Sequence, residues 1–429
     1  MVHLNALALH GSLRDPVLGS LGFLNEVMGR YPEAISFAPG APHPDFLTDL
    51  DPHRYTERFL EHLVHEEGHT PARARRLLFE YGPSRGLINK IVADALRRDQ
   101  GIDVPPSSIV VTVGAQEAML LVLRALFRTR DDVLAVANPC FVGITGAARL
   151  LDIDIVPVDE NDDGIDVDAL AAACATARRE GRRVRACYVA PDFSNPGGNR
   201  MSPQLRTRLL DLAEREDLLL IEDNVYGFTA LSGDALPVLK ALDPGRRVIH
   251  IGTFAKVCFP GARVGYVVAD QPVDDPGGAR LLADELTALK TMVTVNTSPL
   301  SQAVIAGMLL ENGGSLHALT HRKAELYRRN LGCLMDALDR HLDGVAPGIH
   351  WNRPQGGFFV RMHLPVPADT ALLETSASKY GVLWTPMAQF YLDGAGDRQL
   401  RLACSYLDPE QIETGVRRLA TFLTKEIRS

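Results

Sequence analysis

The chain has 429 residues, 46% of them hydrophobic and 23% charged, so it can bury large cores and is long enough for two or more domains. Its formal net charge is -8, with basic residues spread among acidic ones, which argues against nucleic acid or an anionic membrane as partner. No stretch resembles a secretory leader or the ~20 apolar residues of a membrane span, so we expect a cytoplasmic protein that acts on small molecules.

The first hundred residues (1–100) are expected to form an N-terminal arm and part of a small domain. From about residue 109, short β-rich runs alternate with helical stretches, a pattern typical of a mostly parallel sheet covered by helices. Seven strands are predicted, over residues 108–113, 133–137, 153–158, 184–190, 218–222, 248–251 and 264–268. Helices are predicted over residues 115–127, 166–180 and 203–216, the last one capped by Ser202 ahead of Pro203.

These elements predict one large α/β domain over residues 101–312. Beyond it, helix, strand and helix patterns predict a smaller C-terminal α+β domain over residues 313–429. The six cysteines are scattered without metal-like or disulfide-like spacing, so we expect reduced thiols.

Functional groups in such a sheet are expected at the carboxyl ends of its strands. Gly114 follows the first strand and opens a helix, whose free N–H groups suit a phosphate. Phe141 follows the second strand, and polar side chains lie near the ends of two later strands, at Asn195 and Asp223.

The most specific segment is 252–256, which ends in Lys256 and is followed by Arg263. A lysine close to a glycine and a hydroxyl, with an arginine seven residues on, suits a Schiff base near a bound phosphate. Together and in this order, the motifs resemble those of fold-type I, class I/II pyridoxal-phosphate (PLP) aminotransferases across about residues 34–405. The resemblance implies that fold, with its large seven-stranded domain, PLP as cofactor, amino-acid and keto-acid substrates and a homodimer.

The resemblance also implies a role for each matching residue. Lys256 would form the Schiff base and move a proton, and Asp223 would keep the pyridine nitrogen protonated. Asn195 and Tyr226 would hydrogen-bond the ring oxygen, and Phe141 would stack on the ring. The residues implied to hold the phosphate are Gly114, Ala115, Gln116, Thr253 and Arg263, with Tyr81 reaching it from the neighbouring subunit.

At the substrate end, the resemblance implies that Arg401 binds the α-carboxylate in a bidentate pair, close to Asn195. Gly40 matches a glycine that lets the backbone approach that carboxylate.

Four positions depart from the family pattern. Gly197 replaces a common threonine, for which we expect little effect, and Ala255 removes one hydroxyl near the phosphate. Met387 replaces a glycine and is expected to reshape the substrate end of the pocket. Arg361 stands where apolar residues are common, and strand alternation favours a solvent-facing residue over a functional one.

The sequence offers three alternatives to a PLP aminotransferase. Residues 65–69 match the His-Glu-x-x-His pattern of zinc peptidases, but Gly68 and Pro71 favour a solvated helix end over a metal site. A DNA-binding regulator with an aminotransferase-like domain would need a basic recognition helix, which the first hundred residues lack. A PLP enzyme of this fold that diverts the carbanion to β/γ-elimination or replacement, carbon–carbon bond formation or oxidation stays open.

The order of the N-terminal segments, including residues 11–16 and 23–27 ahead of 34–40, is similar to (S)-3,5-dihydroxyphenylglycine transaminases of bacterial antibiotic pathways. This similarity points to secondary metabolism. We therefore predict a PLP-dependent aminotransferase that moves an amino group from an α-amino acid to a keto acid.

Overall fold

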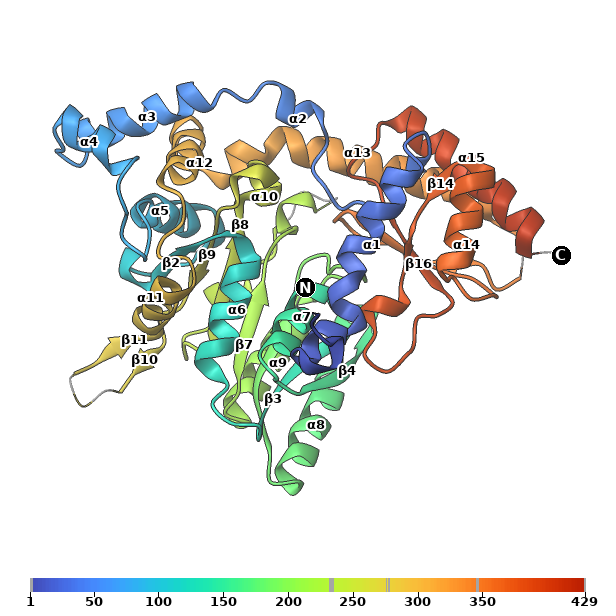
Figure 1. Cartoon of the computed structure of the whole chain (residues 1–429), viewed down its shortest axis with the longest axis horizontal. Helices are drawn as coiled ribbons and strands as arrows, with labels where there is room; N and C mark the ends of the chain where they lie inside the picture. Colours follow the sequence, from blue (N-terminus) through green and yellow to red (C-terminus); the bar gives the residue numbers. More distant parts are fainter. Residues whose placement is uncertain (1–2, 231–234, 275, 277, 345–346, 428–429) are drawn as a thin grey trace.

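The computed structural model describes residues 3–230, 235–274, 276, 278–344 and 347–427 (Figure 1). Its larger part is built on an eight-stranded sheet of order β2-β9-β8-β7-β6-β3-β4-β5. The strands are β2 (Ile109–Thr112), β3 (Asp132–Asn138), β4 (Ile155–Asn161), β5 (Gly164–Ile165), β6 (Arg183–Val189), β7 (Leu219–Asp223), β8 (Val248–Thr253) and β9 (Gly265–Val268). All seven predicted strands are present. The eighth, β5, has two residues, too few to give a sequence pattern.

Strands β4, β3, β6, β7 and β8 run parallel to one another, while β9 is antiparallel to both β8 and β2, and β5 is antiparallel to β4. The central strands are buried on both faces, which explains their continuous apolar runs. Because they run in one direction, the carboxyl ends of β6, β7 and β8 meet at the same edge of the sheet.

Helices cover both faces of this sheet. Leu134 and Val136 pack with α6 (Gly114–Leu126), α7 (Val142–Leu150) and α11 (Leu282–Val293). The alternate residues Val133 and Ala135 pack with α8 (Val167–Arg179) and α9 (Pro203–Arg215) on the other face. The predicted cap of α9 is confirmed, since the Ser202 hydroxyl accepts a hydrogen bond from the Leu205 N–H at 3.2 Å.

The smaller part is an antiparallel sheet of order β12-β13-β16-β15 beside three helices. The strands are β12 (His350–Trp351), β13 (Phe359–His363), β15 (Thr385–Pro386) and β16 (Gln399–Ala403), and the helices are α13 (Leu316–Leu342), α14 (Thr370–Thr375) and α15 (Pro409–Ile427). In Figure 1 the long helix α13 runs from the large sheet unit toward this smaller one. The N-terminal segment joins it by pairing β1 (Ile35–Ser36) with β14 (Val382–Leu383).

The rest of the N-terminal segment contacts both units. Helix α1 (Pro16–Arg30) lies between them in Figure 1 and contacts α7 and η8 (Ala388–Phe390). Helix α3 (Pro52–His65) packs so closely on α12 (Pro299–Glu311) that a Cβ on Gly307 would lie 1.9 Å from the Tyr55 carbonyl oxygen. The remaining helices and strands are η1 (Ala6–Ala8), η2 (Gly11–Arg14), α2 (Asp45–Thr48), α4 (Pro71–Leu77), α5 (Asn89–Gln100), η3 (Pro106–Ser108), η4 (Gly227–Thr229), η5 (Leu239–Leu242), α10 (Phe254–Val257), η6 (Pro260–Ala262), β10 (Pro272–Val273), β11 (Arg280–Leu281) and η7 (Ser376–Tyr380).

The histidines of the zinc-like motif do not share a helix face. Helix α3 ends at His65, and Gly68 has a φ of +72°, so the chain has turned before His69. In the described ranges, no group of three or more His, Cys, Asp or Glu side chains is arranged to hold a metal ion. No helix there is long and apolar enough for a membrane span.

Candidate active site

A cavity of about 610 Å³ lies where the carboxyl ends of β6, β7 and β8 face the small domain. The predicted site residues that line it are Gly40, Ala115, Gln116, Phe141, Asn195, Asp223, Tyr226, Thr253, Lys256, Arg263 and Arg401. Gly114 lies beside the cavity, against Arg263. Tyr81 lies outside it and is 89% exposed in the single chain.

Lys256 is carried by the one-turn helix α10, directly after β8. Its Nζ donates a hydrogen bond to the Gly40 carbonyl oxygen at 2.6 Å. Burial lowers the pKa of Lys256 to about 8, and the positive charges of Arg401 and Arg263 act in the same direction. The neutral amine that a nucleophile requires is therefore more accessible near neutral pH than for an ordinary lysine.

Asp223 ends β7 and is buried. Its Oδ2 accepts a hydrogen bond from the Tyr188 hydroxyl at 2.6 Å, and its Oδ1 has no partner among the described residues. Burial raises the pKa of Asp223 to about 6, although the Tyr188 hydrogen bond opposes this shift. An orphaned carboxylate oxygen at the cavity wall suits a cationic N–H donor such as a protonated pyridine nitrogen.

The N-terminus of α6 and Arg263 form another part of the cavity wall. Gly114 has a φ of +74°, and a Cβ there would lie 2.5 Å from the Arg263 Nη2. The Thr253 Oγ1 accepts the Ala255 N–H at 3.2 Å, which leaves its own proton free to donate. Helix N–H groups, a guanidinium and a hydroxyl form a suitable cradle for a phosphate, so these residues fit PLP.

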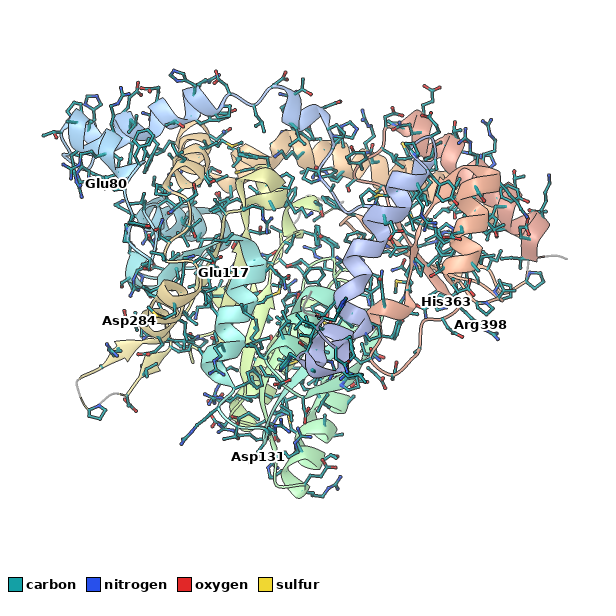
Figure 2. All side chains as sticks on the ribbon, in the orientation of Figure 1. Glu80, Glu117, Asp131, Asp284, His363 and Arg398 are labelled. Atoms are coloured by element: carbon teal, nitrogen blue, oxygen red, sulfur yellow. The ribbon has the colours of Figure 1, made fainter. Side chains whose placement is uncertain are left out.

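A buried ion pair fixes the start of α6. Glu117 (labelled in Figure 2) accepts the Val113 N–H at 2.6 Å and pairs with the Lys290 Nζ at 2.8 Å. The Gln116 carboxamide donates to the Gly143 carbonyl oxygen at 2.8 Å, so this side chain is held against α7. The structure thus directs the Gln116 side chain to α7, whereas its backbone belongs to the first turn of α6.

Arg401 lies in β16 with its guanidinium buried. Its Nη1 donates to the Asn195 Oδ1 at 2.5 Å, and its Nη2 donates to the Ala38 carbonyl oxygen at 2.8 Å and to the Thr385 Oγ1 at 3.2 Å. The guanidinium carbon lies 4.4 Å from the centre of the Phe359 ring. Burial lowers the pKa of Arg401 to about 10, so it remains a cation at neutral pH and suits a carboxylate.

Two aromatic side chains shape the space between these groups. Tyr226 packs edge-on against Phe359 with ring centres 5.5 Å apart, and burial raises the pKa of its hydroxyl. Gly40 is required beside them, because a Cβ there would lie 2.6 Å from the Phe359 Cζ.

The structure corrects two expectations about the departures from the family pattern. Arg361 is not solvent-facing: it is half-buried, its Nε is fully buried, and it shares a face of the small sheet with Arg401. Alternation along the strand predicted the face of the small sheet on which Arg361 lies, but the large domain covers that face. Met387 does not line the cavity, since it is buried against Val142 and Phe390, which do.

Several lining residues gave no sequence signal. Tyr188 lies in the buried strand β6, where its sequence pattern indicates only a core residue. Met28 belongs to α1, which is more than two hundred residues from Lys256 in the sequence. Other lining residues with no recognisable motif are Met119, Val142, Gln389 and Phe390.

Comparisons with known proteins identify the family of the chain. The family model for aminotransferase class I and II matches residues 48–419. The chain is 47% identical over 420 residues to the (S)-3,5-dihydroxyphenylglycine transaminase of Amycolatopsis orientalis, which covers 98% of this chain and 94% of that protein. It is 31% identical over 351 residues to aromatic-amino-acid aminotransferase 1 of Thermococcus litoralis, which covers 81% of each.

Solved structures are similar over nearly the whole chain. Kynurenine aminotransferase of Pyrococcus horikoshii, solved in complex with PMP, has a TM-score of 0.81 and 26% identity, over 100% of this chain and 98% of that one. The alpha-aminoadipate aminotransferase of Thermus thermophilus, complexed with N-(5'-phosphopyridoxyl)-L-leucine, has a TM-score of 0.80 and 27% identity, over 99% of this chain and 100% of that one.

Proposed function

Since this chain belongs to the class I and II aminotransferase family and is a pyridoxal-phosphate-dependent aminotransferase, we propose that its substrates carry an aromatic side chain. It exchanges an amino group between an α-amino acid and a keto acid. We propose (S)-3,5-dihydroxyphenylglycine as the amino acid and secondary metabolism as the setting, because the relative of that name is 47% identical over 98% of the chain. Met28, Met119, Val142 and Phe390 add apolar surface to the cavity, which supports an aromatic ring.

The observation that carries the catalytic proposal is that Lys256, Asp223 and Arg401 line one cavity. PLP, when bound, supplies an aldehyde that reacts with amines and a ring that takes up the electrons left at the substrate α-carbon. In our proposal Lys256 holds the cofactor and, once released, its Nζ removes the α-proton and returns it. The Asp223 carboxylate would keep the ring nitrogen protonated, because a cation beside a carboxylate favours its ionised form.

The other residues bind and orient. Asn195 and Tyr226 would donate to the ring oxygen and Phe141 would stack on the ring. Arg263, Thr253 and the first N–H groups of α6, those of Gly114, Ala115 and Gln116, would hold the phosphate. Arg401 binds the α-carboxylate at the Nη groups that now contact Asn195 and Thr385. Fixing the carboxylate and the cofactor together determines which bond at the α-carbon breaks.

We also propose a homodimer in which Tyr81 of each subunit reaches the phosphate of the other. Supporting observations are the exposed apolar side chains Phe79 (74% exposed) and Met292 (82%), on segments held together by a hydrogen bond of 2.9 Å between Thr291 and Ser84. Val295, beside them, has a φ of +65°, a strained conformation for a β-branched residue.

The six cysteines are unpaired, which supports a reducing compartment, the cytoplasm, as part of the proposal.

The test is to titrate the PLP-loaded protein with (S)-3,5-dihydroxyphenylglycine, phenylglycine, phenylalanine, aspartate and 2-aminoadipate while recording the visible absorption of the cofactor. Arylglycines should convert the cofactor to its amine form with one equivalent of keto acid, and a second keto acid should reverse the change. A preference for aspartate or 2-aminoadipate would contradict the proposal of an aromatic substrate but would leave the transamination reaction in place. Release of a leaving group or of peroxide, with the cofactor returned to its aldehyde form, would support the diverted-carbanion alternative.

A further inference from the structure

The loop that carries Asn195 belongs to the large domain but is packed against the small one. Gly198 has a φ of +73°, and a Cβ there would lie 2.7 Å from the Phe359 carbonyl oxygen in β13. The Asn352 Nδ2 donates to the Gly197 carbonyl oxygen at 2.7 Å. Asn195 itself accepts the hydrogen bond from Arg401. The position of this loop therefore determines how the two domains present Asn195 and Arg401 to each other.

Glu160, near the end of β4, lies against the other side of this loop. Its Oε1 accepts a hydrogen bond from the Ser194 Oγ at 3.4 Å. A Cβ on Gly197 would lie 2.8 Å from the Glu160 Oε2, yet Gly197 is not in the left-handed region of backbone conformation. Space for the carboxylate, rather than backbone freedom, accounts for glycine at a position where threonine is common. The expectation that this replacement has little effect stays a prediction.

Arg361 approaches the same place from the small domain. Its Cα is paired directly with that of Arg401 on the neighbouring strand, and its N–H donates to the Asn352 Oδ1 at 2.8 Å. Among the described residues, its Nε and the Glu160 Oε2 are both buried without a hydrogen-bond partner. The Arg361 charge is the largest influence that favours the ionised form of Glu160. Glu160 and Arg361, which carry opposite charges, thus approach the Asn195 loop from the two domains.

We propose that Glu160 and Arg361 are positioning residues for substrate binding: their attraction holds the Asn195 loop on β13 and keeps Arg401 oriented toward the substrate α-carboxylate. Neither residue lines the cavity, so neither touches the substrate. The proposal rests on the carboxylate-binding role proposed for Arg401. It predicts an effect on the affinity for every substrate with an α-carboxylate, whatever its side chain.

The test compares Arg361→Gln, Glu160→Gln and the double variant with Arg353→Gln, a control whose exposed arginine precedes the same strand and pairs with Asp339. KM for the amino acid and the keto acid should rise about five- to tenfold in each single variant, with kcat within about twofold of wild type. The Kd of 3-phenylpropanoate, a carboxylate that cannot react, should rise equally in calorimetry on the holoenzyme. The double variant should resemble the single ones, Arg361→Lys should recover part of the loss, and the control should behave as wild type.

A pH profile separates this role from a purely structural one. Burial raises the pKa of Glu160 to about 7, with Arg361 acting in the opposite direction. The other ionisable groups facing Glu160 are Tyr391 and Cys140, and burial raises the pKa of both, so they stay neutral. Glu160 is charged above pH 7 and neutral below it. Glu160→Gln should therefore weaken 3-phenylpropanoate binding at pH 8.5 and have little effect at pH 6.

An equal effect at both pH values, additive single variants, or a lower Tm with unchanged KM and Kd would overturn the proposal. If Arg361→Gln does not fold, Glu160→Gln still tests it. Failure of the proposed function looks different, because the wild-type protein would then transfer no amino group, whereas failure of the positioning role leaves the wild type active and the variants with normal affinity.

Discussion

Burial at the edge of the sheet shifts two ionisable groups toward their neutral forms. The pKa of Lys256 falls to about 8 and that of Asp223 rises to about 6, and desolvation is the main cause of both shifts. Each charged form is costly until a partner arrives. A cofactor with a carbonyl for the amine and a cationic nitrogen for the carboxylate supplies both partners.

Replacing Lys256 by alanine should abolish covalent attachment of PLP and lower turnover by at least about a hundredfold, because the base at the α-carbon is lost. Mass spectrometry after borohydride reduction and a steady-state assay measure the two effects. Lys379→Ala is the control, since that lysine is 63% exposed on the small domain. Near-normal turnover in Lys256→Ala would contradict the role of Lys256 as the residue that holds the cofactor and removes the α-proton.

Asp223→Asn should also cost at least about a hundredfold in activity, and it makes a separate prediction for the apo protein. The pKa of Asp223 is higher in the folded than in the unfolded protein, so folding favours its protonated form. As the pH rises from about 4 to about 6, ionisation of Asp223 therefore lowers the free energy of unfolding, by up to about 3 kcal/mol. The apo variant should be more stable than apo wild type at pH 8 and not at pH 4. Urea unfolding at pH 4 and pH 8 measures the free energy of unfolding of both proteins. The same difference between variant and wild type at both pH values would contradict the prediction.

At the scale of elements, short helices bring the chemistry to the strand ends. The first turn of α6 follows β2, and the one-turn helix α10 follows β8, so each is positioned by a buried strand. The glycine after an apolar run was sufficient to predict α6, whereas the lysine segment 252–256 was predicted as a functional segment without a helix. The length of β5 and the burial of Arg361 on β13 were not predictable, because both depend on what packs against the strand.

Gly114→Ala should weaken PLP binding by about tenfold or more, since the new Cβ would displace the Arg263 guanidinium. Gly181→Ala is a matched control, because Gly181 has the same φ of +74° and its Cβ would meet nothing within 4 Å. Both variants should lose a similar free energy of unfolding, about 1 kcal/mol, from backbone strain. Equal PLP affinities in the two variants, measured by equilibrium dialysis, would contradict the proposed cradle.

At the scale of the whole molecule, the exposed apolar surface around Phe79, Tyr81 and Met292 is the feature that a single chain does not explain. Segment 79–85 packs on α11, and Asp284, labelled in Figure 2, binds Arg85 there. A second copy that covers this surface would bring its own Tyr81 with it. The division of the chain at residues 100 and 312 stays a prediction.

The double variant Phe79→Lys/Met292→Lys should convert a dimer of 46.8 kDa chains into monomers and weaken PLP binding, since Tyr81 of the partner is then absent. Light scattering after gel filtration measures the mass. Leu242→Lys, at an exposed leucine on η5, should remain dimeric. A monomeric wild type with full activity would rule out the shared site.

The sequence by itself determined the sheet, because apolar runs and glycine turns are local patterns with local causes, and the family resemblance of its motifs implied the cofactor. Only the tertiary structure decided that Tyr188 reaches Asp223, that Met28 joins the cavity, and that Arg361 is half-buried with its Nε fully buried. Alternation along a strand gives the face on which a side chain lies, but not what covers that face. The covering segments come from distant parts of the chain, so their contacts depend on how the two domains pack.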